Sequence, residues 1–400
     1  LARKAGMSTE ALTVLNPSLS NSVNAGDVIK MPINLPKESE SMIPSKNSAL
    51  YAYLDTAETR GLYFYSPFSE KELSSPELRE AMINENPDYA KYLEFFRGAQ
   101  IAIDSALVLK LNFDISLIKD SDVKSTLDIE SAYKKNALLV PFLESGTNFP
   151  KLKTNESFSV IDIESNINAD NNTIYKPLPS EKYQQRKTLN YLATKDAQVL
   201  IVSDSEEIRN KDLITGIIPD AKFLKFDTTG LIRDEDLENA LDKNRLNYVI
   251  LDSERTIVFL NSTTTLMKKL RDFDIQLAII NTSLIPKKNE VSDLRYRVLK
   301  LIFPTYLNPE NTESATRFEV NYEESFKNKP SKYASLGFDI TLDTLLRLSQ
   351  STSFEDTINE ISSEHIYMKF DYKKIDKSNY SNIGSFLMQY GANEGINKLD

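Results

Sequence analysis

Short runs of Val, Ile and Leu recur along residues 50–400 and constrain the fold of this chain more than any other feature. Several runs are apolar at every position, which is typical of strands buried on both faces of a parallel sheet. The clearest runs are 113–118, 137–142, 158–161, 198–202, 248–251 and 277–280. Amphipathic helical patterns lie before the first of these runs, at 92–107, between two later ones, at 237–241, and after the last, at 342–348. This strand–helix–strand order predicts right-handed crossovers and a doubly wound α/β architecture.

Composition excludes several classes of function. The chain has 400 residues, of which 40% are hydrophobic and 26% charged, so it is expected to be globular. No run of eighteen apolar residues is present, so no transmembrane segment is predicted. The net charge of -10 argues against a nucleic-acid partner, because phosphate contacts need a basic face.

Catalytic and metal-binding motifs are also absent from the sequence. There is no Cys, which excludes disulfides, thiolate catalysis and Cys-bound zinc within this chain. The single histidine, His365, has no second His or Cys to complete a metal site, and we expect it at the surface or at a helix cap. No Gly-x-Ser-x-Gly elbow, phosphate loop or His-Glu-x-x-His motif occurs. We therefore predict no cofactor, no metal and no enzymatic activity.

The first residues resemble part of a cell-wall-binding module. An amphipathic helix at 1–5 is followed by a turn at Gly6, a second helix that stops at Asn16-Pro17, and a closing stretch at 25–32. This order is similar to the last two thirds of a LysM domain, a small β-α-α-β peptidoglycan-binding fold whose opening strand is missing here. The resemblance implies a partial LysM module at 1–33, peptidoglycan as a partner, and a chain that begins inside a domain.

For glycan binding within that module, the resemblance points to Asn16, Pro17 and Leu19, in the loop after the second helix. A module that has lost glycan binding and acts only as a spacer remains an alternative. Residues 34–49 are rich in Pro, Ser and charge, and we expect a linker there.

Two stretches of the large region, 50–400, resemble type I periplasmic binding proteins. Residues 95–106 and 113–121 are similar to the family's first helix and second strand, and residues 318–339 are similar to its region near the carboxyl terminus. The resemblance implies two Rossmann-like lobes joined by crossing strands, with a ligand in the cleft between them. One lobe would comprise about 50–175 and 307–352, and the other about 176–306 and 353–400.

Polar residues follow the apolar runs, where an open parallel sheet binds its ligands. The ligand-cleft candidates are Asp120, Ser121, Ser145, Thr147, Ser203, Asp204, Asp252, Ser253, Asn281 and Thr282. The alternative is that these residues only form polar turns and helix caps. Where the family usually has Gly-Pro after a buried strand, this chain has Val140-Pro141-Phe142, which removes the close backbone approach that glycine allows.

The pairing of modules and this altered strand end lead to one main functional expectation. We expect a non-enzymatic envelope protein, a peptidoglycan-associated scaffold or interaction subunit that joins other envelope proteins in an outer-membrane or secretion-type assembly. Its location would be the periplasm, associated with the outer membrane, as a lipoprotein if an upstream lipobox exists. One alternative is a solute-binding protein for amino acids, sugars or muropeptides. Another is an activator of peptidoglycan synthesis.

Overall fold

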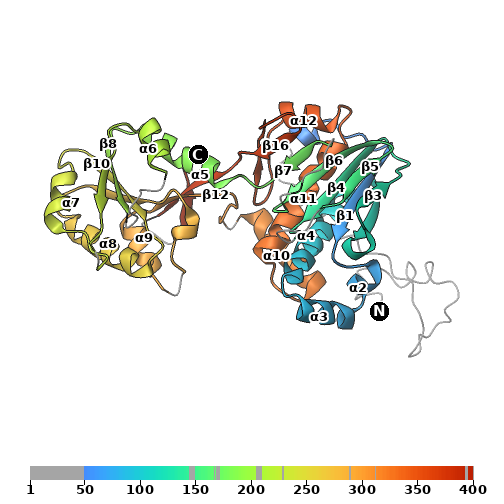
Figure 1. Ribbon diagram of the computed structural model, residues 1–400, viewed down its shortest axis with the longest axis horizontal. Helices are drawn as coiled ribbons and strands as arrows, with labels where there is room; N and C mark the ends of the chain where they lie inside the picture. The colour runs from blue at the N-terminus through green and yellow to red at the C-terminus, as the bar shows by residue number, and fades with distance from the viewer. Residues whose placement is uncertain are drawn as a thin grey trace, which may run out of the picture.

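The computed structural model describes residues 49–143, 149–165, 167, 172–203, 210–227, 229–287, 290–310, 312–391 and 395–399. The LysM-like segment at 1–33, with Asn16, Pro17 and Leu19, lies outside these residues, as does the expected linker apart from Ala49. No helix in the described ranges is long and apolar enough to cross a membrane. Figure 1 shows two α/β lobes placed side by side along the longest axis of the molecule.

The first lobe is built on a seven-stranded sheet with the order β15-β16-β7-β6-β4-β1-β2. Strands β2, β1, β4, β6, β7 and β16 are parallel, and β15 closes one edge in the antiparallel sense. The strands are β1 (Thr59–Ser66), β2 (Asn112–Lys119), β4 (Lys135–Pro141), β6 (Ser157–Ile163), β7 (Ile174–Lys176), β15 (Tyr372–Lys374) and β16 (Asn379–Asn382).

The second lobe repeats this design in the order β18-β17-β12-β11-β10-β8-β9. Strands β9, β8, β10, β11 and β12 are parallel, whereas β17 and β18 are antiparallel additions. The strands are β8 (Ala197–Ser203), β9 (Lys222–Lys225), β10 (Leu246–Asp252), β11 (Ile275–Ala278), β12 (Ile302–Thr305), β17 (Phe386–Tyr390) and β18 (Ile396–Lys398). The doubly wound α/β prediction is confirmed.

Helices cover these sheets, and two small ribbons lie beside them. The first lobe holds α2 (Glu70–Ser74), α3 (Pro76–Glu85), α4 (Tyr89–Val108), α10 (Glu313–Phe326), α11 (Lys332–Leu348) and α12 (Phe354–Glu360). The second holds α5 (Glu181–Ala193), α6 (Lys211–Ile217), α7 (Asp234–Ala240), α8 (Thr256–Lys269) and α9 (Asp293–Val298). The ribbons pair β3 (Thr126–Ile129) with β5 (Lys151–Thr154), and β13 (Ser363–Glu364) with β14 (Lys369–Phe370). Short 3-10 turns are η2 (Ala49–Tyr51), η3 (Asp120–Asp122) and η4 (Thr282–Leu284).

Burial explains why the apolar runs form central strands. From their second residue onward, β4, β8 and β10 are buried at every position, because other elements cover both faces of each sheet. In the first lobe, apolar side chains of β1 and β4 pack with α4, α10 and α11 on one face and with the β3–β5 ribbon on the other. Figure 1 shows α4, α10 and α11 gathered beside the first sheet.

The chain crosses between the lobes after β7, after β12 and after β16. This corrects the lobe boundary expected at residue 353. Strand β16 continues the first sheet, because Asn379 pairs in parallel with Ile174 of β7, whereas Phe386 of β17 pairs with Thr305 of β12. Residues 353–382 therefore belong to the first lobe, and the return to the second lobe begins at 383.

Candidate functional site

Ser203 and Asp252 meet at the carboxyl ends of β8 and β10. The two residues are paired in the parallel ladder, and the Ser203 hydroxyl donates a hydrogen bond of 3.0 Å to Asp252 Oδ2. Both side chains are buried. Because β9 and β10 lie on opposite sides of β8, the strand order reverses here, and such a reversal is where open parallel sheets bind their ligands.

Three further candidates lie at the same edge of the second sheet. Ser253 is buried, and its hydroxyl accepts a 3.1 Å hydrogen bond from the Arg255 amide. Asn281 follows β11, and its side-chain amide donates 2.6 Å to Glu181 at the first turn of α5 while its oxygen accepts from Ser283 N. Thr282 begins η4. These groups form turns and caps and also place polar atoms beside the Ser203–Asp252 pair.

The candidates of the first lobe are more dispersed. Asp120 and Ser121 begin η3 directly after β2, and Ser121 is exposed. Beside them, Lys119 Nζ lies 2.7 Å from Glu72, and this hydrogen bond lowers the pKa of the Glu72 carboxyl to about 2. Ser145, Thr147 and Asp204 lie outside the described residues.

Phe142 covers the end of β4, where the family usually has glycine nearby. Its backbone has φ = 54°, an uncommon left-handed conformation for an aromatic residue. Its amide donates a 2.8 Å hydrogen bond to Ile163 O, and its ring packs edge-on against Phe95 (5.7 Å) and Tyr333 (5.3 Å). The carboxyl end of the central strand in the first lobe is therefore an aromatic surface rather than a set of open amides.

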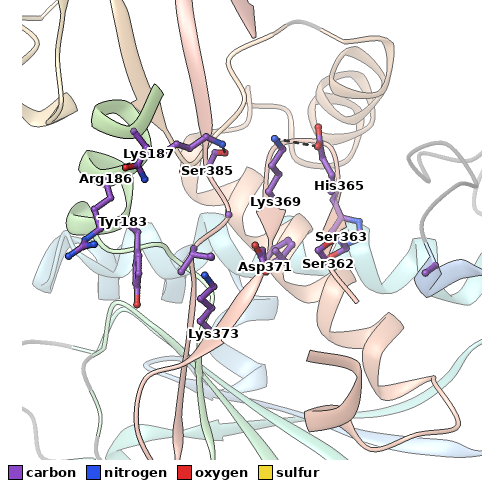
Figure 2. Close-up of a pocket in the computed structure, with 16 residues that line it drawn as sticks. Tyr183, Arg186, Lys187, Ser362, Ser363, His365, Lys369, Asp371, Lys373 and Ser385 are labelled. Atoms are coloured by element: carbon purple, nitrogen blue, oxygen red, sulfur yellow. Dashed lines mark hydrogen bonds and ion pairs between the residues drawn. The ribbon is translucent and has the colours of Figure 1, made fainter. Parts of the chain in front are cut away.

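A separate pocket of about 1210 Å³ lies where the lobes join, and we call it the crossing pocket. Its walls come from α5 of the second lobe, from the β13–β15 region of the first lobe, and from the last crossing segment. Figure 2 shows Arg186 and Lys187 on α5 on one side, with Lys369 and His365 on the other. The lining residues are Ala49, Tyr183, Arg186, Lys187, Asn190, Ser362, Ser363, Glu364, His365, Lys369, Phe370, Asp371, Lys373, Ile383, Gly384 and Ser385.

A buried ion-pair network adjoins this pocket. Arg347 Nε lies 2.7 Å from Asp343 Oδ2, and His365 Nε2 lies 3.1 Å from Asp343 Oδ1. Burial alone would raise the pKa of Asp343, but the Arg347 charge and the His365 hydrogen bond lower it to about 2. His365 is thus 5% exposed, which corrects the expectation of a surface or cap histidine.

Two lining residues carry buried polar atoms that are not satisfied. His365 Nδ1 and Ser385 Oγ have no hydrogen-bond partner among the described residues. Such atoms are uncommon in folded proteins, because a buried polar group that loses water and gains no partner costs about 1–3 kcal/mol. Nowhere in the described ranges does a group of His, Asp and Glu side chains form a candidate metal site. Sequence reasoning missed the crossing pocket, because its walls are about 180 residues apart in the chain and share no spacing motif.

No family model and no curated protein sequence matches the chain. Solved structures do match. They include a putative branched-chain amino acid ABC transporter protein from Rhodospirillum rubrum (8% identity, 86% of this chain and 100% of that chain, TM-score 0.49). They also include a substrate-binding protein from Desulfitobacterium hafniense in complex with leucine (10%, 86% and 99%, TM-score 0.39). A third is the branched-chain amino acid transporter substrate-binding protein LivJ from Streptococcus pneumoniae in complex with isoleucine (11%, 86% and 99%, TM-score 0.34).

Two lobes, each built on a largely parallel sheet and joined by three crossings of the chain, form the architecture that the resemblance to type I periplasmic binding proteins implied. The matched proteins are substrate-binding proteins of transporters, so the leading prediction of a peptidoglycan-associated scaffold joined to other envelope proteins is wrong. No comparison supports a LysM module, peptidoglycan as a partner or association with the outer membrane.

Proposed function

We propose that this chain is a non-enzymatic, two-lobed solute-binding protein that holds a small solute between the carboxyl ends of its two parallel sheets. The observation that carries the proposal is the duplicated strand order, with a reversal between β1 and β4 in one lobe and between β8 and β10 in the other. Where the strand order reverses in an open parallel sheet, a crevice forms at the carboxyl ends of the strands, and ligands bind there. An extracytoplasmic location, the periplasm, goes with this function.

The chemistry of the two strand-end surfaces suggests what kind of solute they suit. The second lobe contributes polar groups: Ser203, Asp252, Ser253, Asn281 and Thr282. The first lobe contributes the rings around Phe142. A solute with a polar group at one end and an apolar body satisfies both surfaces, because small-molecule sites combine apolar lining with a few placed polar groups. Asp120, Ser121, Ser145, Thr147 and Asp204 remain proposed contacts at the same edges.

A thermal-shift screen of the whole chain tests the proposal. The probes are leucine and isoleucine, which are bound in the Desulfitobacterium and Streptococcus proteins, together with benzoate, simple sugars and muropeptides. A true ligand at a hundred times its Kd adds about 2.7 kcal/mol to the free energy of unfolding. Flat melting curves for every class of probe would overturn the proposal.

Paired variants locate the site once a ligand is found. Asp252→Asn removes a carboxylate from the reversal point of the second sheet and is expected to weaken binding at least tenfold. Asp272→Asn removes an exposed carboxylate before β11 and serves as the control. Each variant is compared with its own ligand-free melting curve. Equal affinity for the ligand in both variants would exclude the strand-end site.

A further inference from the structure

Strand β2 is a long edge of the first sheet that no other described strand covers. It pairs in parallel with β1 over eight residues and stands last in the strand order. No backbone hydrogen bond from another described element reaches its outer side. None of its residues is buried. Along the described chain, every second residue of β2 therefore presents an amide and a carbonyl that a further strand could bind.

The other ends of the two sheets are protected in ways that β2 is not. Strands β9, β15 and β18 have only three or four residues each, and β9 and β15 each carry two lysines. Short edge strands and lysines are common means by which proteins prevent pairing with another chain. Strand β2 has twice the length of β9 and one lysine, Lys119, whose Nζ lies 2.7 Å from Glu72 of the same chain. Its one acidic residue, Asp114, lies beside the side chain of Tyr133. Both charges of the strand are thus held within the chain.

The face of β2 that meets the core under α4 is apolar and symmetric about its centre. Phe113, Ile115 and Leu117 alternate onto this face. Phe113 and Leu117 pack against the core of the first lobe, whereas Ile115 is 37% exposed. When two copies of β2 pair in the antiparallel sense with Ile115 opposite itself, Phe113 of each copy lies opposite Leu117 of the other. Directly opposite apolar pairs of this kind stabilise a sheet.

The two ends of β2 also differ in shape, on the same face of the sheet. At its amino end, Leu107 and Val108, the last residues of α4, are 57% and 52% exposed. At its carboxyl end lies a hollow of about 460 Å³. The apolar residues that line this hollow are Leu73, Leu93, Phe96, Leu117 and Phe326. Antiparallel pairing brings the amino end of one β2 to the carboxyl end of the other, so Leu107 and Val108 of each copy meet the hollow of its partner.

Polar groups around the hollow are already engaged within the chain. Arg97 pairs with Glu94 at 2.9 Å, and Arg79 donates to the carbonyl oxygen of Leu73. An apolar occupant therefore suits the hollow better than an anion.

The charges that flank β2 have opposite signs at its two ends. Lys110 is exposed in the turn before the strand, and Asp120 and Asp122 form the turn after it. Antiparallel pairing sets Lys110 of each copy near the acidic turn of the other. This charge complementarity favours a second copy of the same chain as the occupant of the edge.

We propose that β2 is a dimer interface, at which two copies of this chain pair their β2 strands about a two-fold axis at Ile115 and join their first sheets into one. A two-fold interface uses the same surface of both copies, so a protrusion at one end of β2 and a hollow at the other satisfy each other twice. The crossings between the lobes follow β7 and β16, near the opposite end of the first sheet. The second lobe therefore stays free to move in the dimer.

Light scattering of the whole chain during gel filtration tests the proposal. The mass of two chains is expected. Ile115→Lys sets two like charges opposite each other and should raise the dissociation constant of the dimer at least tenfold. Ile257→Lys is the matched control, because Ile257 of α8 lies in the second lobe and is 51% exposed. Melting curves confirm that each variant is folded. The mass of a single chain at every concentration, or equal effects of the two variants, would overturn the interface.

Disulfide trapping tests the position of the axis, and the chain suits it because it has no cysteine. Opposite residues of an antiparallel pair have Cα atoms about 4.5–5.5 Å apart, a separation that a disulfide spans. Ile115→Cys should therefore form a covalent dimer under mild oxidation, whereas Ile257→Cys should stay a single chain on a non-reducing gel. Equal trapping of the two variants would overturn the register. The interface is independent of the strand-end site, so Asp252→Asn should dimerise as the wild type does.

Discussion

Gly98 of α4 and Gly337 of α11 let these two helices touch backbone to backbone in the core of the first lobe. A Cβ atom added at Gly98 would lie 1.9 Å from the Ala334 carbonyl oxygen, and one added at Gly337 would lie 1.9 Å from the Phe95 carbonyl oxygen. Both glycines belong to the stretches that resemble type I periplasmic binding proteins. The two glycines in these stretches therefore serve the close packing of two helices. The sequence resemblance indicates the fold and does not indicate which ligand is bound.

Gly98→Ala should destabilise the protein, because the new methyl group meets fixed backbone instead of a movable side chain. Overpacking of this kind costs about 1–3 kcal/mol. Gly216→Ala is the control, since Gly216 lies inside α6 and has nothing within 4 Å of an added Cβ. That substitution should stabilise by about 0.5–1 kcal/mol. Urea denaturation measures both, and equal effects would contradict the backbone contact.

Phe142 offers a test of the strand-end surface in the first lobe. Its φ of 54° strains any residue with a Cβ, whereas glycine adopts it without cost. Both Phe142→Ala and Phe142→Gly lose the ring contacts with Phe95 and Tyr333. The glycine variant should nevertheless be about 1 kcal/mol more stable than the alanine variant. The reverse order in chemical denaturation would show that the backbone at 142 is not left-handed.

Asp339 of α11 should make stability depend on pH. Burial raises its pKa from 3.8 to about 6, against the influence of His365 and of the Tyr367 and Met368 amides that it accepts. The native state thus holds a proton that the unfolded chain has released. The resulting stabilisation is fully present below pH 3.8 and is lost as pH rises through about 6.

The variant Asp339→Asn removes this titration and keeps an oxygen for both amides. Between about pH 4.5 and 7.5, the unfolding free energy of the wild type should fall relative to the variant by roughly 2 kcal/mol, at about 1.4 kcal/mol per pH unit between pH 4.5 and the raised pKa. Asp343 contributes little slope in that window, because its stabilisation is present above about pH 3.8 and is lost as pH falls from there towards 2. Parallel curves for wild type and variant would refute the assignment to Asp339.

The parts of the fold that sequence predicted are those with local signals. The run 198–202 is apolar from Val199 onward and lies in β8, a central strand buried on both faces. Residues 372–382 carry no such signal, since β15 and β16 are short and β15 is largely exposed, and the sequence-based boundary placed them in the second lobe. Residues 372–382 are assigned to the first lobe only by the parallel pairing of Asn379 with Ile174, about 200 residues earlier in the chain.

The candidate sites also differ in whether local sequence signals could identify them. Ser203 and Asp252 could be selected from sequence, because each ends a recognisable strand and neighbouring strands end at one edge. The crossing pocket could not, because it joins α5 to a ribbon near the carboxyl terminus. His365 is an example, because its side chain is hydrogen-bonded to Asp343 of α11. Nothing in the spacing of these two residues predicts that their side chains meet.

The central claim is that a solute sits between the two lobes, and small-angle X-ray scattering with and without a stabilising solute tests it most directly. Ligands that bind between hinged lobes favour the closed arrangement. The radius of gyration of the wild-type chain should therefore decrease on addition of the solute that raises its melting temperature, and Asp252→Asn should not respond at the same concentration. A radius of gyration that stays constant at saturating solute would contradict the account.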